Sequence, residues 1–144
     1  MENIKDKKQE KTADIKSFRD LRIYQGSYKN MMVIIKNLLP LLPDSEKNDL
    51  KSQLSRSSKA IPRLIAEGYA KRHQRAGFQK YLDDAMAECN ETVVSLEQCK
   101  DLYLKEPASG RCKKLSEDYE IIGRQIYKLT IAWSKFKKRE GVDT

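Results

Sequence analysis

The spacing of apolar residues constrains the fold of this chain more than any other feature. From Phe18 onward, apolar side chains recur at intervals of three and four residues along four successive segments. This is the period of a helix that buries one face. Apolar and polar residues do not alternate over any useful length, as they would in a half-buried strand. The pattern therefore predicts an all-α fold.

Each of the four predicted helices carries a stripe of apolar or small residues. The stripe of the first helix is Leu21, Tyr24, Tyr28, Met31, Ile35, Leu38 and Leu42. That of the second helix is Leu50, Leu54, Ser57, Ile61, Leu64 and Gly68. The third stripe is Phe78, Leu82, Ala85, Cys89, Val93, Leu96 and Tyr103, and the fourth is Leu115, Tyr119, Ile122, Ile126, Leu129, Trp133 and Phe136. We expect these residues to form the core.

The ends of the first two helices are marked by residues with known positional preferences. Ser17 or Asp20 could cap the start of the first helix, and Asp44 or Ser45 the start of the second. Pro40 closes the first helix because a proline cannot continue the hydrogen-bond ladder. The predicted helices are therefore separated by short breaks.

The length of the chain and these short breaks together predict its topology. The chain has 144 residues, the size of a single domain. Short connections at 68–77 and 106–110 force neighbouring helices to run antiparallel. We therefore expect residues 17–140 to form an antiparallel up-down-up-down four-helix bundle. The segments 1–16 and 141–144 are expected to be solvated tails.

Pro62 lies in the interior of the second predicted helix, where a proline removes one hydrogen bond and clashes with the preceding turn. It leaves the carbonyl of Ser58 without its usual donor, so we predict a helix kink at Pro62. Gly68 would either permit a close approach of another helix or end the helix in the left-handed conformation. Packing alone is enough to explain a kink at this place.

The first helix also carries apolar residues outside its stripe. These are Ile23, Met32, Ile34 and Leu39. A helix that is apolar around much of its circumference is either deeply buried or half of an interface. We therefore predict that the protein forms a homo-oligomer through these four residues.

Positive charge is concentrated in one third of the chain. The net charge is +8 at pH 7, and residues 51–80 hold eight Lys and Arg residues against a single acidic residue, Glu67. An antiparallel bundle would bring further basic residues from the ends of the second and fourth helices to one pole. The residues expected at this pole are Lys71, Arg72, His73, Arg75, Lys135, Lys137, Lys138 and Arg139.

A second group of basic residues lies along the second helix. Arg56, Lys59 and Arg63 form a stripe on the face opposite its buried residues. Cations near helix C-termini complement the helix dipole, which accounts for the C-terminal cluster but not for this stripe. We expect both groups to bind a polyanion, with RNA or DNA the first candidate and phosphates the main contact. The alternative is a protein-interaction module whose charge complements an acidic partner.

The sequence offers little material for a catalytic site. His73 is the single histidine, and no motif for a nucleophile, a phosphate loop or a metal-binding bundle is present. Asp83, Asp84, Glu88 and Glu91 lack histidine partners and are better explained as a solvated helix face. We expect a non-enzymatic protein with no catalytic residues, no bound metal and no cofactor.

The cysteines and the hydropathy of the chain bear on its compartment. The three cysteines, Cys89, Cys99 and Cys112, are odd in number and form no close pair. They are typical of reduced thiols in a cytoplasmic protein. No apolar run reaches the roughly 20 residues that span a bilayer, and no apolar signal core is present near the N-terminus. We expect a cytoplasmic protein without a membrane partner.

Four stretches resemble a known family. The sequence FRDLRIYQ at 18–25, QLSRSS at 53–58, IPRLIAEG at 61–68 and FQKYL at 78–82 carry the resemblance. Together they are similar to the small bacterial four-helix-bundle proteins encoded within intervening sequences of large-subunit ribosomal RNA genes. The Ile-Pro followed by Ile-Ala-Glu-Gly is the most distinctive of these motifs.

The resemblance carries expectations about assembly and role. It implies that the chain is a subunit of a ring-like homo-oligomer, with five subunits in the ring. The family includes the accessory variability proteins of diversity-generating retroelements, and that branch is associated with nucleic acid and a reverse transcriptase. The resemblance therefore implies a nucleic-acid-binding accessory protein. A protein-interaction module of the same family with no nucleic-acid role stays open as the alternative.

Overall fold

The computed structural model describes residues 14–74 and 77–139, with side chains as far as Lys135. Four α-helices occur in these residues: α2 (Arg22–Val33), α3 (Leu50–Ala70), α4 (Gly77–Leu102) and α5 (Ala108–Arg139). Short 3-10 turns occur at Phe18–Asp20, Leu39–Leu41 and Asp44–Glu46, and a π turn at Ile34–Leu38. No strand occurs in this part of the chain, so the all-α prediction is confirmed. The tail predicted at 1–16 lies mostly outside the described residues, and the tail at 141–144 lies entirely outside them.

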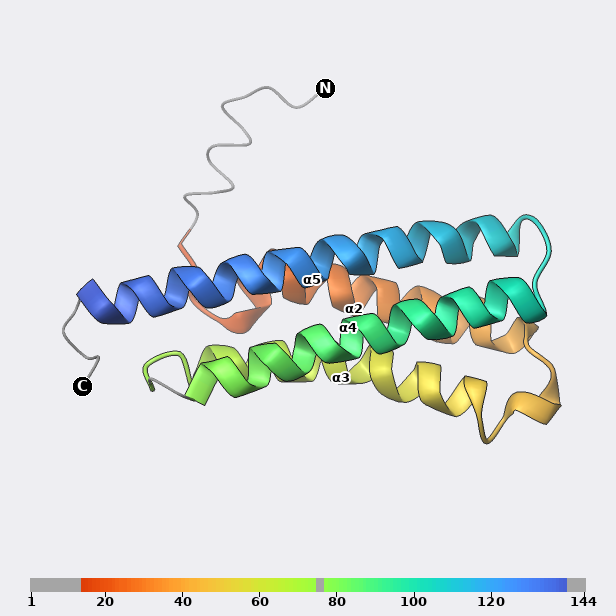
Figure 1. The fold of residues 1–144 in the computed structure, drawn as a ribbon, viewed down its shortest axis with the longest axis horizontal. Helices are drawn as coiled ribbons and strands as arrows, with labels where there is room; N and C mark the ends of the chain where they lie inside the picture. Colours follow the sequence, from red (N-terminus) through yellow and green to blue (C-terminus); the bar gives the residue numbers. More distant parts are fainter. Residues whose placement is uncertain (1–13, 75–76, 140–144) are drawn as a thin grey trace, which may run out of the picture.

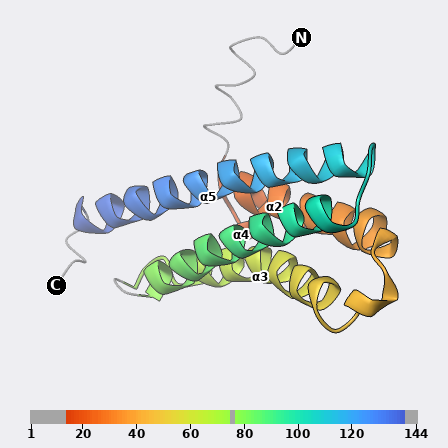
Figure 2. The same cartoon turned by 45° about the vertical axis from the view of Figure 1, so that its right-hand side comes forward.

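The four helices lie lengthwise beside one another around a common core (Figures 1 and 2). α2 packs against α3 and α5, α3 packs against α4, and α4 packs against α5. The segment that joins α3 to α4 lies at the same end of the molecule as the end of α5 (Figure 1). The connections from α2 to α3 and from α4 to α5 lie at the other end.

The core of the last three helices follows the predicted stripes closely. In α4 the buried residues include Phe78, Leu82, Ala85, Cys89, Val93 and Leu96. In α3 they include Leu50, Leu54, Ser57, Ile61 and Gly68, and in α5 they include Leu115, Tyr119, Ile122 and Ile126. Regular α-helices keep the three-and-four spacing in register with the core, which is why the pattern identified these residues. Tyr103 departs from the pattern, because α4 ends at Leu102 and leaves the Tyr103 ring on the surface. Leu64, Leu129 and Trp133 are half-buried against the core, and the side chain of Phe136 lies outside the described residues.

The predicted stripe of the first helix is partly correct, since Leu38 and Leu42 are buried and Leu21, Tyr24 and Ile35 pack half-buried against the core. Ser27 is fully buried, whereas Tyr28, which the pattern placed in the core, is 46% exposed. The buried residues before the helix widens are Ile23 and Ser27. The hydroxyl of Ser27 donates a hydrogen bond to the carbonyl of Tyr24 at 3.1 Å, so its burial leaves no unpaired donor. A small polar residue with a local partner can thus replace an apolar residue in the core.

The first helix widens into the π turn before it ends. The amide of Leu39 donates to the carbonyl of Ile34, five residues back. This wider turn places both Ile34 and Leu38 in the core. Ile23 and Ile34 were predicted at a subunit interface, but the structure buries them inside the subunit. The other two residues of that prediction, Met32 and Leu39, are half-buried.

The capping predictions were correct for the first helical segment and wrong for the second. The Ser17 hydroxyl accepts a hydrogen bond from the amide of Arg19 at 3.1 Å and caps the 3-10 turn before α2. α3 begins at Leu50, later than Asp44 or Ser45 would allow, because a 3-10 turn occupies Asp44–Glu46. The carboxylate of Glu46 accepts the Leu50 amide at 3.1 Å and takes the role of the cap. The loop predicted at 106–110 is also shorter than expected, since α5 begins at Ala108.

Pro62 and Gly68 lie on faces of α3 that pack closely. The helix continues without a break through Pro62, whose ring is buried. A Cβ atom added to Gly68 would lie 3.2 Å from the side chain of Leu82 in α4. Gly68 therefore serves a close helix contact, and the helix runs on past it to Ala70. A kink at Pro62 stays a prediction.

Polar contacts also join α3 to α4. The hydroxyl of Thr92 lies 2.9 Å from that of Ser57 in the buried interface and 2.8 Å from the carbonyl of Glu88. On the surface, the guanidinium of Arg56 forms ion pairs with Glu88 at 3.1 Å and with Glu91. Burial raises the pKa of the Glu88 carboxyl, and the Arg56 guanidinium opposes this effect.

A further polar contact joins the start of α3 to the segment after α4. The hydroxyl of Tyr103 donates to the Glu46 carboxylate at 2.6 Å. The hydroxyl of Tyr103, and then the amide of Leu50, lower the pKa of Glu46 below its ordinary value of 4.5. In return, the Glu46 carboxylate raises the pKa of Tyr103 above 10.0. The contribution of this contact to stability therefore depends on pH in two ranges: at acid pH, where Glu46 binds a proton, and at alkaline pH, where Tyr103 loses one.

The buried position of Ile34 predicts a large effect of shortening its side chain. We expect Ile34→Ala to lower the free energy of unfolding by about 2–5 kcal/mol, because it leaves a cavity in a close-packed core. The matched control is Ile121→Ala on α5, where the side chain is 44% exposed and the expected change is within about 0.5 kcal/mol. Urea denaturation followed by circular dichroism measures both. Equal decreases for the two variants would contradict the assignment of Ile34 to the subunit core.

The Tyr103–Glu46 contact predicts a pH-dependent stability. We expect Tyr103→Phe to melt at a lower temperature than the wild type at neutral pH. The folded-state pKa of Glu46 is lowered, so the difference in melting temperature between the two proteins has its full size above pH 4.5. This difference shrinks as the pH falls through the lowered pKa. The folded-state pKa of Tyr103 is raised, so the difference also shrinks as the pH rises beyond 10.0.

Thermal melts across the pH range measure this linkage. Tyr127→Phe is the control, since the Tyr127 side chain is exposed and its hydroxyl makes no hydrogen bond within the described residues. A melting difference for Tyr103→Phe that stays constant down to strongly acid pH would show that the stabilisation does not depend on ionised Glu46.

Candidate nucleic-acid interface

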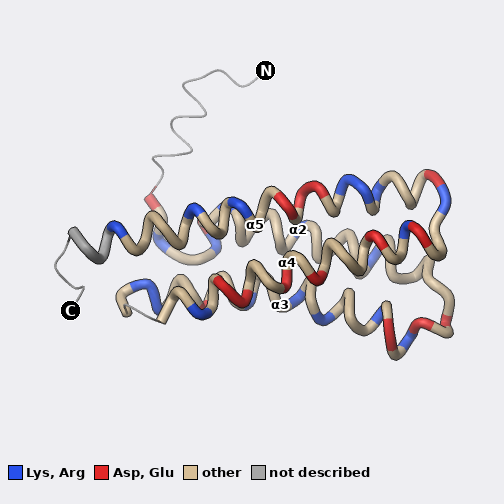
Figure 3. The backbone as a smooth tube through the Cα atoms, viewed as in Figure 1, with Lys and Arg blue, Asp and Glu red and all other residues tan. Residues whose placement is uncertain are grey.

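Lysine and arginine residues from two separate parts of the chain lie at the same end of the bundle (Figure 3). Lys71 and His73 follow α3 directly and are exposed. Lys135 lies near the end of α5 and is also exposed. None of these three side chains forms an ion pair within the described ranges. We call this set the basic end, and its two lysines present unneutralised positive charge to solvent.

Arg72 lies between two of these residues but is held against the protein. Its guanidinium lies 3.9 Å from the centre of the Tyr69 ring and donates a hydrogen bond to the carbonyl of Tyr69 at 2.8 Å. The side chain is partly buried as a result. Stacking leaves one face and several N–H groups of a guanidinium free, so the charge of Arg72 adds to the basic end from a fixed position.

Four of the predicted contact residues have side chains outside the described part of the chain. Arg75 lies outside the described residues. Lys137, Lys138 and Arg139 belong to the last turns of α5, at the basic end, but the description of side chains stops at Lys135. Their positions along the backbone agree with the predicted cluster, and their contacts stay a prediction.

Arg56 was predicted to contact nucleic acid, and this contact stays a prediction, although its guanidinium is engaged with the protein itself. Its guanidinium bridges Glu88 and Glu91 of α4, as described above, so two carboxylates neutralise it. Those carboxylates raise its pKa further and hold it in the charged, paired form. The sequence does contain the partners, at 88 and 91, but only the register of α3 on α4 shows that they meet Arg56.

Lys59 and Arg63, the other members of the predicted stripe, remain accessible to an anionic ligand. Both are exposed and neither forms an ion pair in the part of the chain that the structure describes. The guanidinium Nε of Arg63 donates to the carbonyl of Lys59 at 3.4 Å, a weak local contact. Both residues line a pocket of about 510 Å³ between α3 and the start of the first helix.

Sequence reasoning missed the other wall of this pocket. Phe18, Tyr24, Tyr28 and Met31 line it opposite Lys59 and Arg63. The helical period assigned the two tyrosines to the core. Their amphipathic character was the available signal, because a tyrosine ring with a polar end commonly sits at a boundary with solvent.

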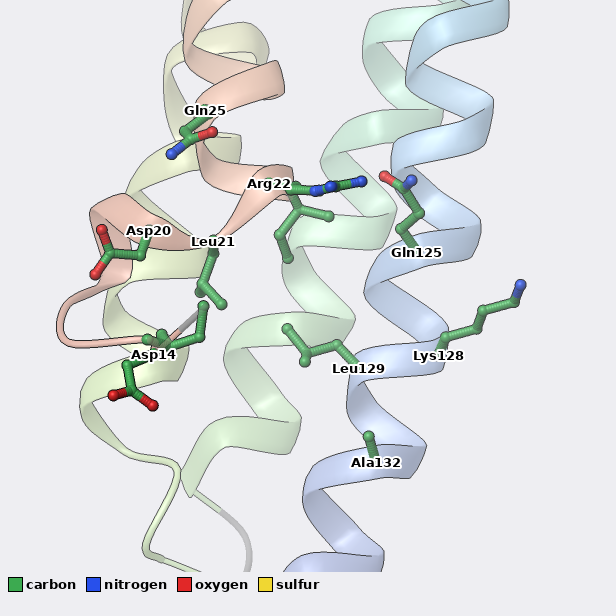
Figure 4. Close-up of a pocket in the computed structure, with 11 residues that line it drawn as sticks. Asp14, Asp20, Leu21, Arg22, Gln25, Gln125, Lys128, Leu129 and Ala132 are labelled. Atoms are coloured by element: carbon green, nitrogen blue, oxygen red, sulfur yellow. The ribbon is translucent and has the colours of Figure 1, made fainter. Parts of the chain in front are cut away.

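A larger pocket of about 960 Å³ lies between the segment before α2 and the middle of α5 (Figure 4). Leu21 and Leu129 supply apolar surface, and the side chain of Arg22 extends toward Gln125. The carboxylate of Asp20 accepts hydrogen bonds from two backbone amides, at 2.9 and 3.0 Å, and these lower its pKa. The Asp20 carboxylate is therefore engaged in capping, and the lining contains no histidine or cysteine.

The remaining reactive groups are buried or isolated. Cys89, Cys99 and Cys112 are free and buried, and burial raises the pKa of their thiols to about 12, about 12 and about 11. Within the described residues, no three His, Cys, Asp or Glu side chains form a group that could hold a metal ion. None of the helices described here combines the length and apolarity that a membrane span requires.

The helical fold and the quoted motifs agree with the comparison to known protein families. Residues 19–128 match the 23S rRNA-intervening sequence protein family. The matched range contains α2, α3 and α4 and most of α5. No curated protein and no solved structure matches the chain. Because the family match spans well over half of its length, this chain belongs to the 23S rRNA-intervening sequence protein family.

Proposed function

We propose that this protein is a non-enzymatic, homo-oligomeric scaffold whose basic end binds nucleic acid. The observation that carries the proposal is that Lys71 and Lys135 at the basic end are exposed and form no ion pair within the described residues. The fixed guanidinium of Arg72 and the exposed side chain of His73 follow Lys71 directly in the sequence. Charges of this kind contact phosphates and carry little sequence information. Binding would therefore be weakly sequence-specific and would weaken steeply with salt.

In this proposal each subunit is an antiparallel up-down-up-down bundle and five subunits form a ring, as the family resemblance implies. A ring presents several copies of the basic end to one polyanion, which raises the effective affinity without any new contact. In the retroelement branch of the family, such a scaffold would hold nucleic acid beside a reverse transcriptase. The proposal places the protein in the cytoplasm, where free thiols such as its three buried cysteines stay reduced.

Apolar side chains on the surface of α5 support self-association. Tyr127 is 57% exposed and Ile131 lies one turn further along the same helix, also exposed. Together with Met86 of α4 they line a pocket of about 690 Å³. Exposed apolar patches with a hollow of this kind are typical of protein–protein contacts. We propose this surface as a subunit contact in place of Ile23 and Ile34.

The basic end predicts how charge removal affects binding. We expect the double variant Lys71→Ala, Lys135→Ala to bind random single-stranded RNA more weakly than the wild type. The slope of log affinity against log salt should fall by about one for each phosphate that the variant no longer neutralises. The matched control is Lys113→Ala, Lys114→Ala, which removes two exposed lysines from the start of α5, at the opposite end. Fluorescence anisotropy at several salt concentrations measures both variants.

Two outcomes would count against the nucleic-acid proposal. Equally weakened binding in the two double variants would mean that the whole positive surface attracts RNA and that the basic end has no special part. Weak binding at low salt with no salt slope in the wild type would favour the alternative, in which the charge complements an acidic protein partner.

The α5 surface predicts the effect of two substitutions on assembly. We expect the double variant Tyr127→Ser, Ile131→Ser to lower the mass of the assembly, which in the wild type should lie near five times the 16.7 kDa of the subunit. Val94→Ser, Leu102→Ser removes two exposed apolar residues from α4 and should leave the mass unchanged. Light scattering measures the mass. An unchanged mass in both variants would exclude the α5 surface as a subunit contact.

A further inference from the structure

A row of aromatic rings runs along the edge of the bundle where the first helix begins. The rings of Phe18 and Tyr24 lie 4.9 Å apart, centre to centre, in an edge-to-face arrangement. The Tyr24 and Tyr28 rings follow at 5.8 Å, tilted by 37°. The guanidinium of Arg19 lies 4.5 Å from the centre of the Phe18 ring. The row therefore has a cation stacked at one end and the exposed Tyr28 ring at the other.

This row forms one wall of the 510 Å³ pocket, and the wall opposite belongs to α3. The α3 wall combines the apolar surfaces of Pro62 and Ala66 with two cations, Lys59 and Arg63. A pocket with an apolar lining and a few polar groups at its rim is typical of a binding site for a small planar group. Its volume lies within the usual range for such sites.

The charges around the pocket favour an anion on one side. Lys59 and Arg63 carry no ion pair within the described residues, and no acidic residue lines the pocket. Arg63 also lines the neighbouring pocket between α3 and α4, together with Glu67, Asp84 and Glu88. Carboxylates therefore offset its charge on the α4 side, whereas on the α2 side the described lining offers a polyanion two cations and no carboxylate.

We propose that this pocket binds an unpaired nucleobase on the Tyr28 ring, with the adjoining phosphates on Lys59 and Arg63. The proposal rests on the proposed function and specifies it further, because it names single-stranded nucleic acid as the ligand. Stacking on an aromatic ring requires a base that is free of its duplex, whereas the phosphate contacts of the basic end accept either form. The aromatic pocket therefore distinguishes single-stranded from double-stranded nucleic acid, and the basic end attracts the phosphates of either form.

The test compares one RNA sequence as a single strand and as a duplex, each labelled for anisotropy. We expect Tyr28→Ala to weaken binding of the single strand by about 5- to 150-fold, the range that removal of one stacked base supports. Affinity for the duplex and the salt slope should stay as in the wild type. Tyr28→Phe keeps the ring and should bind the single strand as the wild type does. Leu102→Ala, which removes an exposed apolar side chain from the end of α4, should have no effect on binding.

A spectroscopic measurement separates stacking from a general loss of structure. A single strand with 2-aminopurine in its centre should lose fluorescence on binding to the wild type and to Tyr28→Phe, because a stacked base is quenched. The quenching should be absent with Tyr28→Ala at protein concentrations that saturate binding. Quenching that persists in Tyr28→Ala would overturn the assignment of the base to this ring.

Failure of this inference can be told apart from failure of the proposed function. If the wild type binds single strand and duplex equally, and Tyr28→Ala changes neither, the basic end binds nucleic acid but the aromatic pocket does not select a strand. If the wild type binds neither form at low salt, the nucleic-acid function fails and the pocket assignment fails with it.

Discussion

The close contact between α3 and α4 is the constraint on which the rest of the structure depends. Gly68 lies where an added Cβ atom would meet Leu82 at 3.2 Å, and Ser57 and Thr92 share a buried hydrogen bond further along the same interface. Small residues at these two places allow one register only, since a shift by one turn would bring a bulky residue such as Leu64 into the Gly68 position. The core and the surface charges both follow from this register.

The register decides which cations of α3 are neutralised. It places Arg56 opposite Glu88 and Glu91, so the α4 side of the helix is closed by ion pairs. Lys59 and Arg63 lie further along α3 and line the pocket beside the first helix, where the described lining residues include no carboxylate, although Arg63 also borders the acidic pocket next to α4. The same helix therefore has a paired flank and an open cationic flank. Lysines and arginines also occur elsewhere along the described helices, mixed with acidic residues (Figure 3).

The sequence predicted those parts of the fold that regular helices determine. In α3, α4 and α5 the three-and-four spacing identified the core because no irregular turn disturbs it. In the first helix the predicted stripe missed the buried Ser27 and Ile34, and neither a buried serine nor a π turn leaves a signal in the spacing of apolar residues. For the candidate site, the order of the helices predicted the basic end. Tyr28 was misassigned to the core and the ion pairs of Arg56 were missed, because the surroundings of both residues depend on side-chain contacts between helices.

The three buried cysteines have a practical consequence for work on this protein. Alkylating reagents attack the thiolate, and burial makes the thiolate of Cys89, Cys99 and Cys112 scarce at neutral pH and shields it from solvent. A cysteine introduced on the surface would therefore react with a maleimide dye long before the native ones. A dye can therefore be attached through an introduced surface cysteine while Cys89, Cys99 and Cys112 stay in place, and the core need not be altered first.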